Sequence, residues 1–453
     1  MKKQPAKKSF FFDEGYRKVG RAFVGAWAST FDPRAMKRVF SNFFTFIPNL
    51  IVFLIITAGR IVINIILSIL LATVFLCIAP LVWISYITVG FLDFLYRFFR
   101  KISVVCTVCQ QRSDLPVYIC PKCKVEHTRL VPSAYGILYR TCNCGQKLPT
   151  TFFNGRQKLD SHCQFCPTPT PGNGHQMEIV IPVIGGPGSG KTCLVSTSLN
   201  AIETNPSLRA THNIEVTGST KSDYEEIIND MHSGSLPDKT FDTRMKYYQF
   251  YFTPKTEKVK RLVALCDIGG EVFKKDTLVE KQIGFRFADS FLIVIDPLSI
   301  VDYKKSVERR GIDVKPYKPS NLEIDHMLTR FISLLDNFRG SKKSGSVRND
   351  VAIVFTKCDI PGLDDEIGKR AAALYATRNN VSVAEAQDKL CEEFLIKYGA
   401  ANFVQTINSR FKNARYFTCT SLGGVNRTSF APEDVDKPVL WLVERAVSYI
   451  KRK

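Results

Sequence analysis

The sequence predicts an α/β domain with a mixed, mostly parallel sheet and one antiparallel hairpin, preceded by a small metal-bound module and a transmembrane α-helical hairpin. Three observations predict these parts. Residues 291–296 and 351–355 are continuous apolar runs, as expected of buried parallel strands. Eight cysteines fall in four close pairs between Cys106 and Cys166. Residues 43–96 form an apolar stretch that carries only two charges.

The composition bounds the class of protein and its compartment. A chain of 453 residues is long enough for two or three domains, and its 45% hydrophobic content supplies a sizeable core. The formal net charge of +20 favours acidic partners, either nucleic acid or an anionic membrane surface. The close cysteine pairs indicate metal ligands in a reducing compartment rather than disulfides.

The N-terminal arm, residues 1–42, is basic and is expected to lie in the cytoplasm. Its first 40 residues hold ten Lys or Arg and three acidic residues, a net charge of +7. Residues 97–101 add three more basic side chains just after the apolar stretch. The positive-inside rule places both basic flanks in the cytoplasm.

Residues 43–99 are expected to span the lipid bilayer, and two helices fit their length better than one. A secretory signal is excluded because the apolar run starts too late and is too long. As one helix the run would measure roughly 80 Å, against ~30 Å for the hydrocarbon core. Cytoplasmic flanks require an even number of crossings. Gly59-Arg60, Ala79-Pro80 and residues 68–72 are candidate turns, and a single tilted span or a partly re-entrant hairpin stays open.

Residues 103–168 are predicted to form a module that holds two zinc ions. Each close pair can sit on a tight turn that directs two thiolates at one ion, and two pairs complete a tetrahedral site. Such closed sites are structural, and small domains of this kind need the metal to fold. We expect the first pair to share an ion with the second and the third with the fourth, with a crossed arrangement as the alternative. The predicted ligands are Cys106, Cys109, Cys120, Cys123, Cys142, Cys144, Cys163 and Cys166.

A nucleic-acid-binding role for this module is a weaker interpretation. Zinc ribbons can bind nucleic acid, and the module contains Lys122, Lys124, Arg129 and Arg140. Much of the charge excess flanks the apolar stretch instead, so we read these four as ordinary surface charge and do not expect nucleic acid as a partner. Residues 169–176, rich in Pro, Gly and Thr, have the composition of a linker.

The remaining domain, residues 177–453, opens with a phosphate-binding loop. Residues 185–192 read GGPGSGKT and match G-x-x-x-x-G-K-[ST] between a predicted strand and a predicted helix. The glycines let backbone N–H groups surround phosphate oxygens, and the helix N-terminus adds positive charge. Lys191 is predicted to reach the β- and γ-phosphates, and the Thr192 hydroxyl to ligate Mg²⁺. The predicted phosphate-binding residues are Gly185, Gly186, Gly188, Ser189, Gly190, Lys191 and Thr192.

A predicted antiparallel hairpin, residues 245–252 and 260–266, leads to a second Mg²⁺ ligand. The connection between these strands is too short for a parallel crossover. Asp267 ends the second strand, where its carboxylate can hold Mg²⁺ directly or through water. Gly270 is then placed to offer its backbone N–H to the γ-phosphate.

Two insertions enlarge the domain, at residues 297–346 and 361–414. The second insertion includes predicted amphipathic helices at 364–377 and 383–398. A last helix is predicted from residue 437 to the C-terminus.

The run Thr356-Lys357-Cys358-Asp359 follows the apolar strand 351–355 and completes a set of three motifs. GxxxxGK[ST], DxxG and [NT]KxD, in this order and each at a strand end, resemble the translation-factor-like (TRAFAC) class of P-loop GTPases. The resemblance implies a guanine nucleotide as ligand. Asp359 would accept hydrogen bonds from N1 and N2 of guanine, and the aliphatic stem of Lys357 would cover the base. Ser421 falls in a stretch similar to the last base-contacting loop of that class.

The same resemblance assigns roles in hydrolysis. A threonine that closes over Mg²⁺ is expected between the phosphate loop and the hairpin, and Thr240 is chosen over Thr243. Glu271 stands where many relatives have a glutamine that orients the attacking water. Lys191, Glu271 and Thr240 are therefore the predicted catalytic residues.

The layout of the chain also resembles the bacterial double-GTPase family from about Cys106 onward, and the run Cys142–Pro149 adds to this resemblance. It implies a protein of the bacterial inner membrane, with its N-terminus and GTPase domain in the cytoplasm. The expected ligands are GTP or GDP, Mg²⁺ and two Zn²⁺. A protein effector or a second GTPase is an expected partner.

The expected reaction is hydrolysis of GTP to GDP and phosphate by a Mg²⁺-dependent molecular switch. A membrane-tethered scaffold that binds GTP with little hydrolysis stays open for two reasons. Pro187 lacks an N–H inside the phosphate loop, and the Glu271 carboxylate is poorly suited to lie beside the charge of a γ-phosphate. Slow or partner-stimulated hydrolysis is expected in either case.

Overall fold

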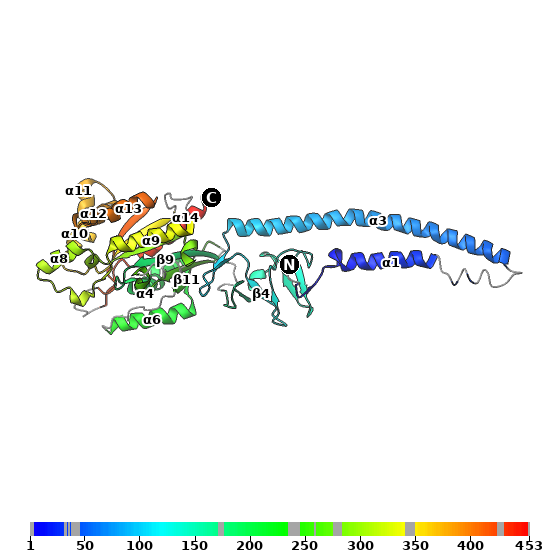
Figure 1. Cartoon of the computed structure of the whole chain (residues 1–453), viewed down its shortest axis with the longest axis horizontal. Helices are drawn as coiled ribbons and strands as arrows, with labels where there is room; N and C mark the ends of the chain where they lie inside the picture. The colour runs from blue at the N-terminus through cyan, green and yellow to red at the C-terminus, as the bar shows by residue number, and fades with distance from the viewer. Residues whose placement is uncertain are drawn as a thin grey trace. The chain divides into compact units, whose positions relative to one another are not determined.

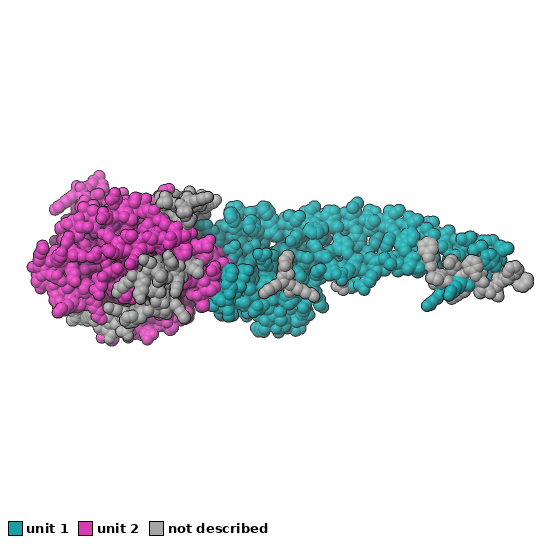
Figure 2. All heavy atoms as spheres, in the orientation of Figure 1, with its two compact units in different colours: residues 1–102, 114–175 teal, residues 103–113, 176–453 magenta. Residues whose placement is uncertain are grey.

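The computed structural model describes most of the chain, and these residues form two compact units (Figure 2). Unit 1 comprises residues 1–102 and 114–175, and unit 2 comprises residues 103–113 and 176–453. The described residues are 4–30, 34, 37, 46–170, 176–233, 245–257, 260–274, 283–339, 349–423 and 430–451.

Unit 2 is built on a seven-stranded mixed sheet in which the strand before the phosphate loop is central. The first two strands in the sheet order pair antiparallel with their neighbours, and the other neighbouring pairs are parallel. The predicted sheet class and the predicted hairpin are therefore confirmed. In sheet order the strands are β10 (His212–Val216), β11 (Lys246–Pro254), β12 (Arg261–Asp267), β9 (Met177–Gly185), β13 (Ser290–Ile295), β14 (Asp350–Phe355) and β15 (Ala414–Thr418).

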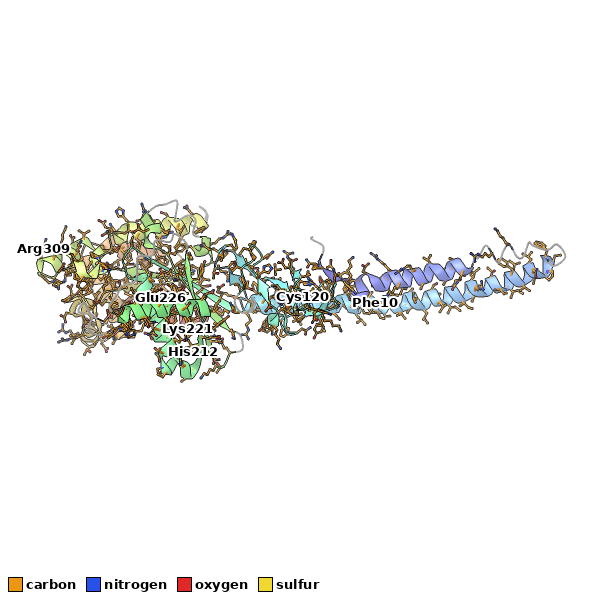
Figure 3. All side chains as sticks on the ribbon, turned by 90° about the horizontal axis from the view of Figure 1, so that it is seen from below. Phe10, Cys120, His212, Lys221, Glu226 and Arg309 are labelled. Carbon is orange, nitrogen blue, oxygen red and sulfur yellow. The ribbon has the colours of Figure 1, made fainter. Side chains whose placement is uncertain are left out.

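Helices cover both faces of this sheet and bury one apolar core on each (Figure 1). α4, α6 and α14 supply one core, and α8, α9, α12 and α13 supply the other. On the first face, Nζ of Lys221 from α6 lies 3.1 Å from Oε1 of Glu203 on α4 (Figure 3). The helices are α4 (Lys191–Thr204), α5 (Pro206–Thr211), α6 (Gly218–His232), α8 (Val301–Arg309), α9 (Ile324–Arg339), α10 (Leu363–Ile367), α11 (Lys369–Asn379), α12 (Val383–Lys397), α13 (Ala401–Arg410) and α14 (Lys437–Lys451).

The order in which the strands are used places a ligand-binding edge beside β9. From β9 the chain builds β10, β11 and β12 on one side, and then β13, β14 and β15 on the other. This reversal is a topological switch point, where open α/β sheets bind ligands beyond the carboxyl ends of their strands. Pro182 is tolerated in this central strand because the pairing of β9 with β13 begins only at Val183.

Two features of unit 2 differ from the sequence analysis. The segment predicted as one helix at 364–377 is two helices, because Gly368 adopts an extended conformation between α10 and α11. β10 and α6 were not predicted at all. Their apolar residues alternate with many polar ones, so the sequence pattern there is weak.

Residues 103–113 belong to unit 2, although they lie in the range predicted for the cysteine module. They form β2 (Val104–Val105) and β3 (Arg112–Ser113), and Val105 is part of a core of unit 2. The Val105 N–H donates to Oε2 of Glu178 at 2.5 Å. Burial raises the pKa of Glu178 to about 8, although this hydrogen bond and nearby Arg112 oppose the shift.

Unit 1 contains two small three-stranded sheets with a small core. Its buried apolar cluster consists of Tyr118, Cys120, Leu130, Cys142 and Leu148. A core of this size is typical of modules that depend on a metal for stability. The sheets are β1 (Ala6–Lys7), β6 (Tyr139–Cys142) and β7 (Lys147–Pro149), and β5 (Glu126–His127), β4 (Val117–Ile119) and β8 (Ser161–His162).

The apolar segment is one continuous helix, α3 (Phe46–Phe99), so the predicted division into two helices is wrong. Pro80 lies inside the helix and removes one backbone hydrogen bond without ending it. Between Arg60 and Asp93 the sequence has no cluster of polar turn residues that could compete with helix. By length and composition α3 can cross a membrane, and the most apolar 18-residue window is 0% buried.

α3 is nevertheless one arm of a helical hairpin, whose other arm is α1 (Glu14–Thr30) (Figure 1). Near the start of α1, the Tyr16 and Phe75 rings lie 5.3 Å apart. Near its end, Nδ2 of Asn64 donates to the Ala26 carbonyl at 3.2 Å and to Oγ1 of Thr30 at 2.6 Å. The two helices are therefore antiparallel.

The C-terminal end of α3 is joined to the cysteine-rich part of unit 1 by a buried ion pair. Asp93 is 1% exposed, and its carboxylate lies 3.1 Å from Nη1 of Arg156, which is 0% exposed. The backbone N–H of Phe152 donates to the other carboxylate oxygen of Asp93 at 3.0 Å. The Tyr96 and Phe152 rings stack with centroids 4.5 Å apart. One face of this end of α3 is therefore covered by protein, while Phe94 and Phe98 remain exposed.

Candidate functional site

The phosphate loop connects the end of β9 to the start of α4, as its sequence predicted. Gly188 and Gly190 have φ angles of 74° and 87°, which a residue with a side chain rarely adopts. Lys191 is 6% exposed, and its Nζ donates to the carbonyls of Gly185 at 3.0 Å and Gly186 at 2.9 Å. Burial lowers the pKa of Lys191, and Asp267 and Glu271 oppose the shift. A phosphate group at this loop would supply an anionic partner for this buried ammonium group.

The two predicted Mg²⁺ ligands are in contact. Oγ1 of Thr192 donates to Oδ2 of Asp267 at 2.7 Å. Asp267 is 1% exposed, its Oδ1 is buried without a hydrogen-bond partner among the described residues, and burial raises its pKa. A buried carboxylate oxygen without a partner beside a hydroxyl fits a hard divalent cation. The donor set therefore fits Mg²⁺.

The segment after Asp267 lies directly against the phosphate loop. A Cβ at Gly270 would lie 2.3 Å from the Pro187 nitrogen, so the two backbones are in close contact. Glu271 begins the turn that follows Gly270, is half-buried, and is near enough to raise the pKa of Lys191. The predicted phosphate-sensing glycine and the predicted water-orienting residue thus lie at this loop.

The predicted base-reading motif, residues 356–359, follows β14 at the same edge of the sheet. Oγ1 of the buried Thr356 donates to the Ser189 carbonyl of the phosphate loop at 2.7 Å. Nζ of Lys357 donates to the Gly188 carbonyl at 2.8 Å and lies 2.6 Å from Oδ2 of Asp296. These contacts fix the motif beside the phosphate loop.

Asp359 is held from the side of β15. Oγ1 of Thr420 donates to Oδ1 of Asp359 at 3.1 Å, and the Cys358 N–H donates to the Cys419 carbonyl at 3.3 Å. Ser421, predicted to contact the base, is 8% exposed, and its hydroxyl has no hydrogen-bond partner in the part of the chain that the structure describes. Lys191 and Asp359 therefore lie at one edge of one sheet.

The sequence analysis missed some of the residues in this cluster, and one predicted residue lies outside it. Asp296 and Thr420 were not assigned roles. An apolar strand that ends in a carboxylate, FLIVID, is a signal that could have identified Asp296. The switch residue Thr240 and its alternative Thr243 lie outside the described residues.

Comparison with known proteins relates part of the chain to a protein family. A family model described as Double-GTPase 2 matches residues 179–398. These residues form a Double-GTPase 2 domain. The resemblance noted in the sequence is therefore confirmed, and the matched range of this Double-GTPase 2 domain includes both the phosphate loop and Asp359. No curated protein sequence matches the chain significantly.

Several solved structures resemble the chain weakly. The Saccharomyces cerevisiae Ski7 GTPase-like domain bound to GTP is 17% identical, with a TM-score of 0.31; the match covers 60% of this chain and 51% of that one. The Arl6 small GTPase of Trypanosoma brucei is 12% identical, with 60% and 99% covered and a TM-score of 0.27. A bacterial selenocysteine-specific elongation factor is 13% identical, with 60% and 29% covered and a TM-score of 0.24. The match thus spans about half the length of the Ski7 chain.

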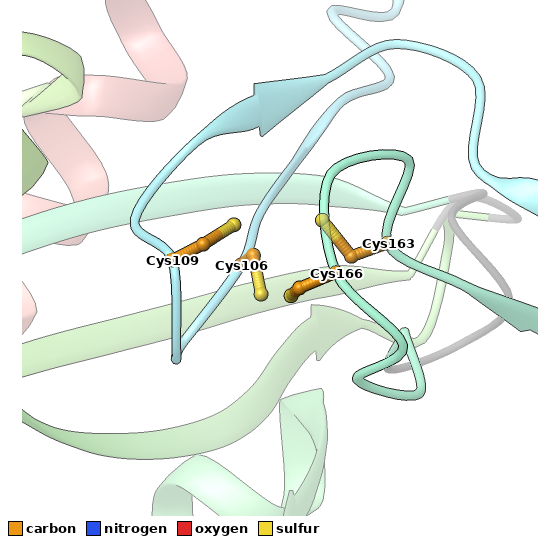
Figure 4. A group of neighbouring side chains, drawn as sticks. All are labelled: Cys106, Cys109, Cys163 and Cys166. Carbon is orange, nitrogen blue, oxygen red and sulfur yellow. The ribbon is translucent and has the colours of Figure 1, made fainter.

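The eight paired cysteines form two groups of four, and the grouping corrects the predicted pairing. Cys106, Cys109, Cys163 and Cys166 form one group (Figure 4), and Cys120, Cys123, Cys142 and Cys144 form the other. In each group the four sulfur atoms lie within 4.8 Å of one another. The first pair is therefore grouped with the fourth and the second with the third. The spacing could not show this, because the grouping depends on which turns the fold brings together.

The local geometry of both groups fits zinc. A tetrahedral ion with bonds of ~2.3 Å separates its ligands by about 3.8 Å, and Sγ of Cys120 lies 3.7 Å from Sγ of Cys144. The residue after the second cysteine has a positive φ in three of the four pairs, as tight metal-binding turns require. These residues are Gln110 (57°), Lys124 (57°) and Gly145 (90°).

Proposed function

We propose that this protein is a membrane-anchored GTP-binding protein that hydrolyses GTP to GDP and phosphate as a Mg²⁺-dependent switch. The observation that carries the proposal is the connection between the two ends of the site. Lys357, from the base-reading motif, donates to the phosphate-loop carbonyl of Gly188, and Thr356 donates to that of Ser189. The segment predicted to bind the triphosphate and the segment predicted to read guanine are thus parts of one framework.

The residues present suggest how hydrolysis would be assisted. Lys191 and the inward-facing N–H groups of the loop would neutralise charge on the β- and γ-phosphates. Thr192 and Asp267 would hold Mg²⁺, which supplies positive charge between these phosphates when bound. Glu271 would orient the attacking water. The Gly270 N–H would contact the γ-phosphate, so its segment would respond to loss of that phosphate.

Two observations favour a switch with slow intrinsic hydrolysis. Glu271 places a carboxylate near the reacting phosphate, and Pro187 removes one N–H donor from the phosphate loop. The alternative is a scaffold that binds GTP without turnover, and phosphate release under multiple-turnover conditions separates the two. Release of many equivalents supports the switch, whereas a single equivalent or none supports the scaffold.

The other parts of the chain support an attachment role. The exposed apolar surface of α3 fits a lipid bilayer, and the net charge of +20 fits an anionic membrane surface. Two Zn²⁺ bound by the two cysteine groups would stabilise the small cysteine-rich module. A protein effector or a second GTPase would recognise the segments that respond to the nucleotide.

The experiment that tests the ligand is nucleotide competition with the full-length protein in detergent. Unlabelled GTP should displace labelled GTP at least a hundredfold more effectively than ATP does. Asp359→Asn should weaken GTP binding and admit xanthosine triphosphate, because the amide reverses one donor–acceptor pair with the base. Equal displacement by ATP, or an unchanged base preference in the variant, would refute guanine recognition by Asp359.

A further inference from the structure

The segment from Lys315 to Leu322, in the insertion between β13 and α9, lies on the phosphate loop. A Cβ at Gly188 would lie 3.3 Å from the Lys318 carbonyl, and one at Gly186 would lie 2.5 Å from the Ser320 hydroxyl. This segment was read from sequence only as part of an insertion. In the fold it is a direct neighbour of the most conspicuous motif in the chain.

Hydrogen bonds fix the segment to Asp296 and Lys357, two residues beside the phosphate loop. The Ser320 N–H donates to Oδ2 of Asp296 at 2.8 Å, and Nζ of Lys357 donates to the Lys318 carbonyl at 3.2 Å. Asp296 is 1% exposed, so its contact with Ser320 is shielded from water. Lys318 itself has a φ of 45°, a conformation unfavourable for a lysine, and the contacts around it hold it there.

Two neighbouring side chains of the segment differ in burial. Tyr317 packs on the core of unit 2, and burial, with the nearby Asp359 carboxylate, raises its pKa to about 12. The Lys318 side chain is exposed and forms no ion pair among the described residues.

We propose that residues 315–322 are a nucleotide-binding element of this domain, in which Lys318 places a positive charge beside the phosphate nearest the ribose. The inference rests on the proposed function. The Lys318 carbonyl lies against Gly188 of the phosphate loop and accepts a hydrogen bond from Nζ of Lys357, so Lys318 lies between the phosphate loop and the base-reading motif. The α-phosphate and ribose occupy this interval when a nucleotide joins the two ends. Lys318 thereby adds affinity that the three sequence motifs do not supply.

The proposal predicts which nucleotides bind more weakly when the Lys318 charge is removed. GTP and GDP share the α-phosphate, so loss of the Lys318 charge should lower the affinity for both nucleotides by the same factor. A cation that contacted the γ-phosphate would affect GTP alone. A segment that only supports the loop would affect the stability of the empty protein.

The test measures GTP and GDP affinity of the full-length protein in detergent by fluorescence with labelled nucleotides. Lys318→Ala should lower both affinities about tenfold, and Lys318→Glu should lower them further. Lys318→Arg should keep wild-type affinity. Lys412→Ala, at an exposed lysine just before β15 and outside this segment, is the control and should change the affinity for neither nucleotide. The melting temperature of the empty protein should be the same in all four variants.

The outcomes separate this inference from the function on which it rests. If the wild type binds no guanine nucleotide, the proposed function fails. If it binds and Lys318→Ala binds as tightly, the inference is wrong and the function stands. A loss confined to GTP, or a loss matched by Lys412→Ala or explained by a lower melting temperature, also overturns the inference.

Discussion

At the scale of single residues, Gly270 has no room for a side chain, although its φ angle is ordinary. A Cβ there would lie 2.3 Å from the Pro187 nitrogen and 2.5 Å from the Gly186 carbonyl carbon. Both neighbours are backbone atoms, which cannot rotate away. Close backbone contact is therefore the reason for glycine at this point of the motif.

We predict that Gly270→Ala separates the two segments and lowers the stability of the empty domain by about 1–3 kcal/mol, the usual cost of overpacking. Thermal unfolding of the full-length protein measures the change. Gly218→Ala is the control, because a Cβ at Gly218 meets nothing within 4 Å. Equal melting temperatures for the two variants would show that the contact with Pro187 carries no cost.

A second residue-scale feature is the carboxylate of Asp388, which caps the free edge of the sheet. Its Oδ1 accepts a hydrogen bond from the Tyr416 N–H of edge strand β15 at 2.6 Å. Burial raises the pKa of Asp388 to about 6 from an ordinary 3.8, and the Tyr416 hydrogen bond opposes the shift. The favourable contribution of Asp388 to the free energy of unfolding is thus fully present below about pH 4 and is lost as the pH rises through 6.

We predict that Asp388→Asn becomes progressively more stable relative to the wild type between about pH 4 and pH 6, and that the difference stays constant at higher pH. The partly exposed position limits the gain to about 1 kcal/mol. Denaturant unfolding at a series of pH values measures it. A constant difference for Asp388→Asn would exclude the proposed titration.

At the scale of elements, the nested arrangement of the cysteine pairs has a measurable consequence. Two substitutions remove one zinc if they fall in one group and two zincs if they fall in different groups. Cys106→Ser with Cys163→Ser falls in one group, and Cys106→Ser with Cys120→Ser falls in both.

We therefore predict about one zinc per chain for the first double variant and none for the second, against two for the wild type. Metal analysis of the purified full-length protein gives these numbers directly. Cys77→Ser, at an exposed cysteine of α3 that belongs to neither group, should keep both ions. Sequential pairing would give the opposite result for the two double variants.

The elements also show what sequence reasoning could reach. The strands β9, β13 and β14 are continuous apolar runs, and the motifs at their ends locate the phosphate and base-reading segments. Their meeting at one edge follows from parallel pairing. The contribution of residues 315–322 could not be predicted, because it depends on where an insertion folds back. The grouping of the cysteine pairs is likewise decided by which turns the fold brings together, which spacing does not encode.

At the scale of the whole molecule, the number of helices in the apolar segment does not by itself give the number of membrane crossings. Residues 43–99 were predicted to form a hairpin but contain one helix, α3. An even number of membrane crossings is still obtained if α1 and α3 cross together. β1 pairs with β6, so residues 6 and 7 lie in the cysteine-rich part of unit 1. α1 leads away from this point, and α3 returns beside it to the buried Asp93–Arg156 pair.

We accordingly predict that the N-terminus and the cysteine-rich part lie on the same side of the membrane. Epitope tags at residue 1 and residue 453 can be probed in sealed membrane vesicles with an antibody added from outside. Both tags should be accessible to it, or both should be protected from it. Cys77, exposed on the apolar helix, should resist a water-soluble maleimide in intact membranes and react after solubilisation in denaturing detergent.

The topology measurement can contradict this arrangement in two ways. Tags that respond oppositely would require α3 to be a lone crossing, and β1 could then not pair with β6 in the membrane-bound protein. Rapid labelling of Cys77 in intact membranes would place the middle of α3 in water, so that its apolar surface would have to be covered by protein. The pairing of β1 with β6 and the proposed membrane crossing of α3 are thus tested independently in one preparation.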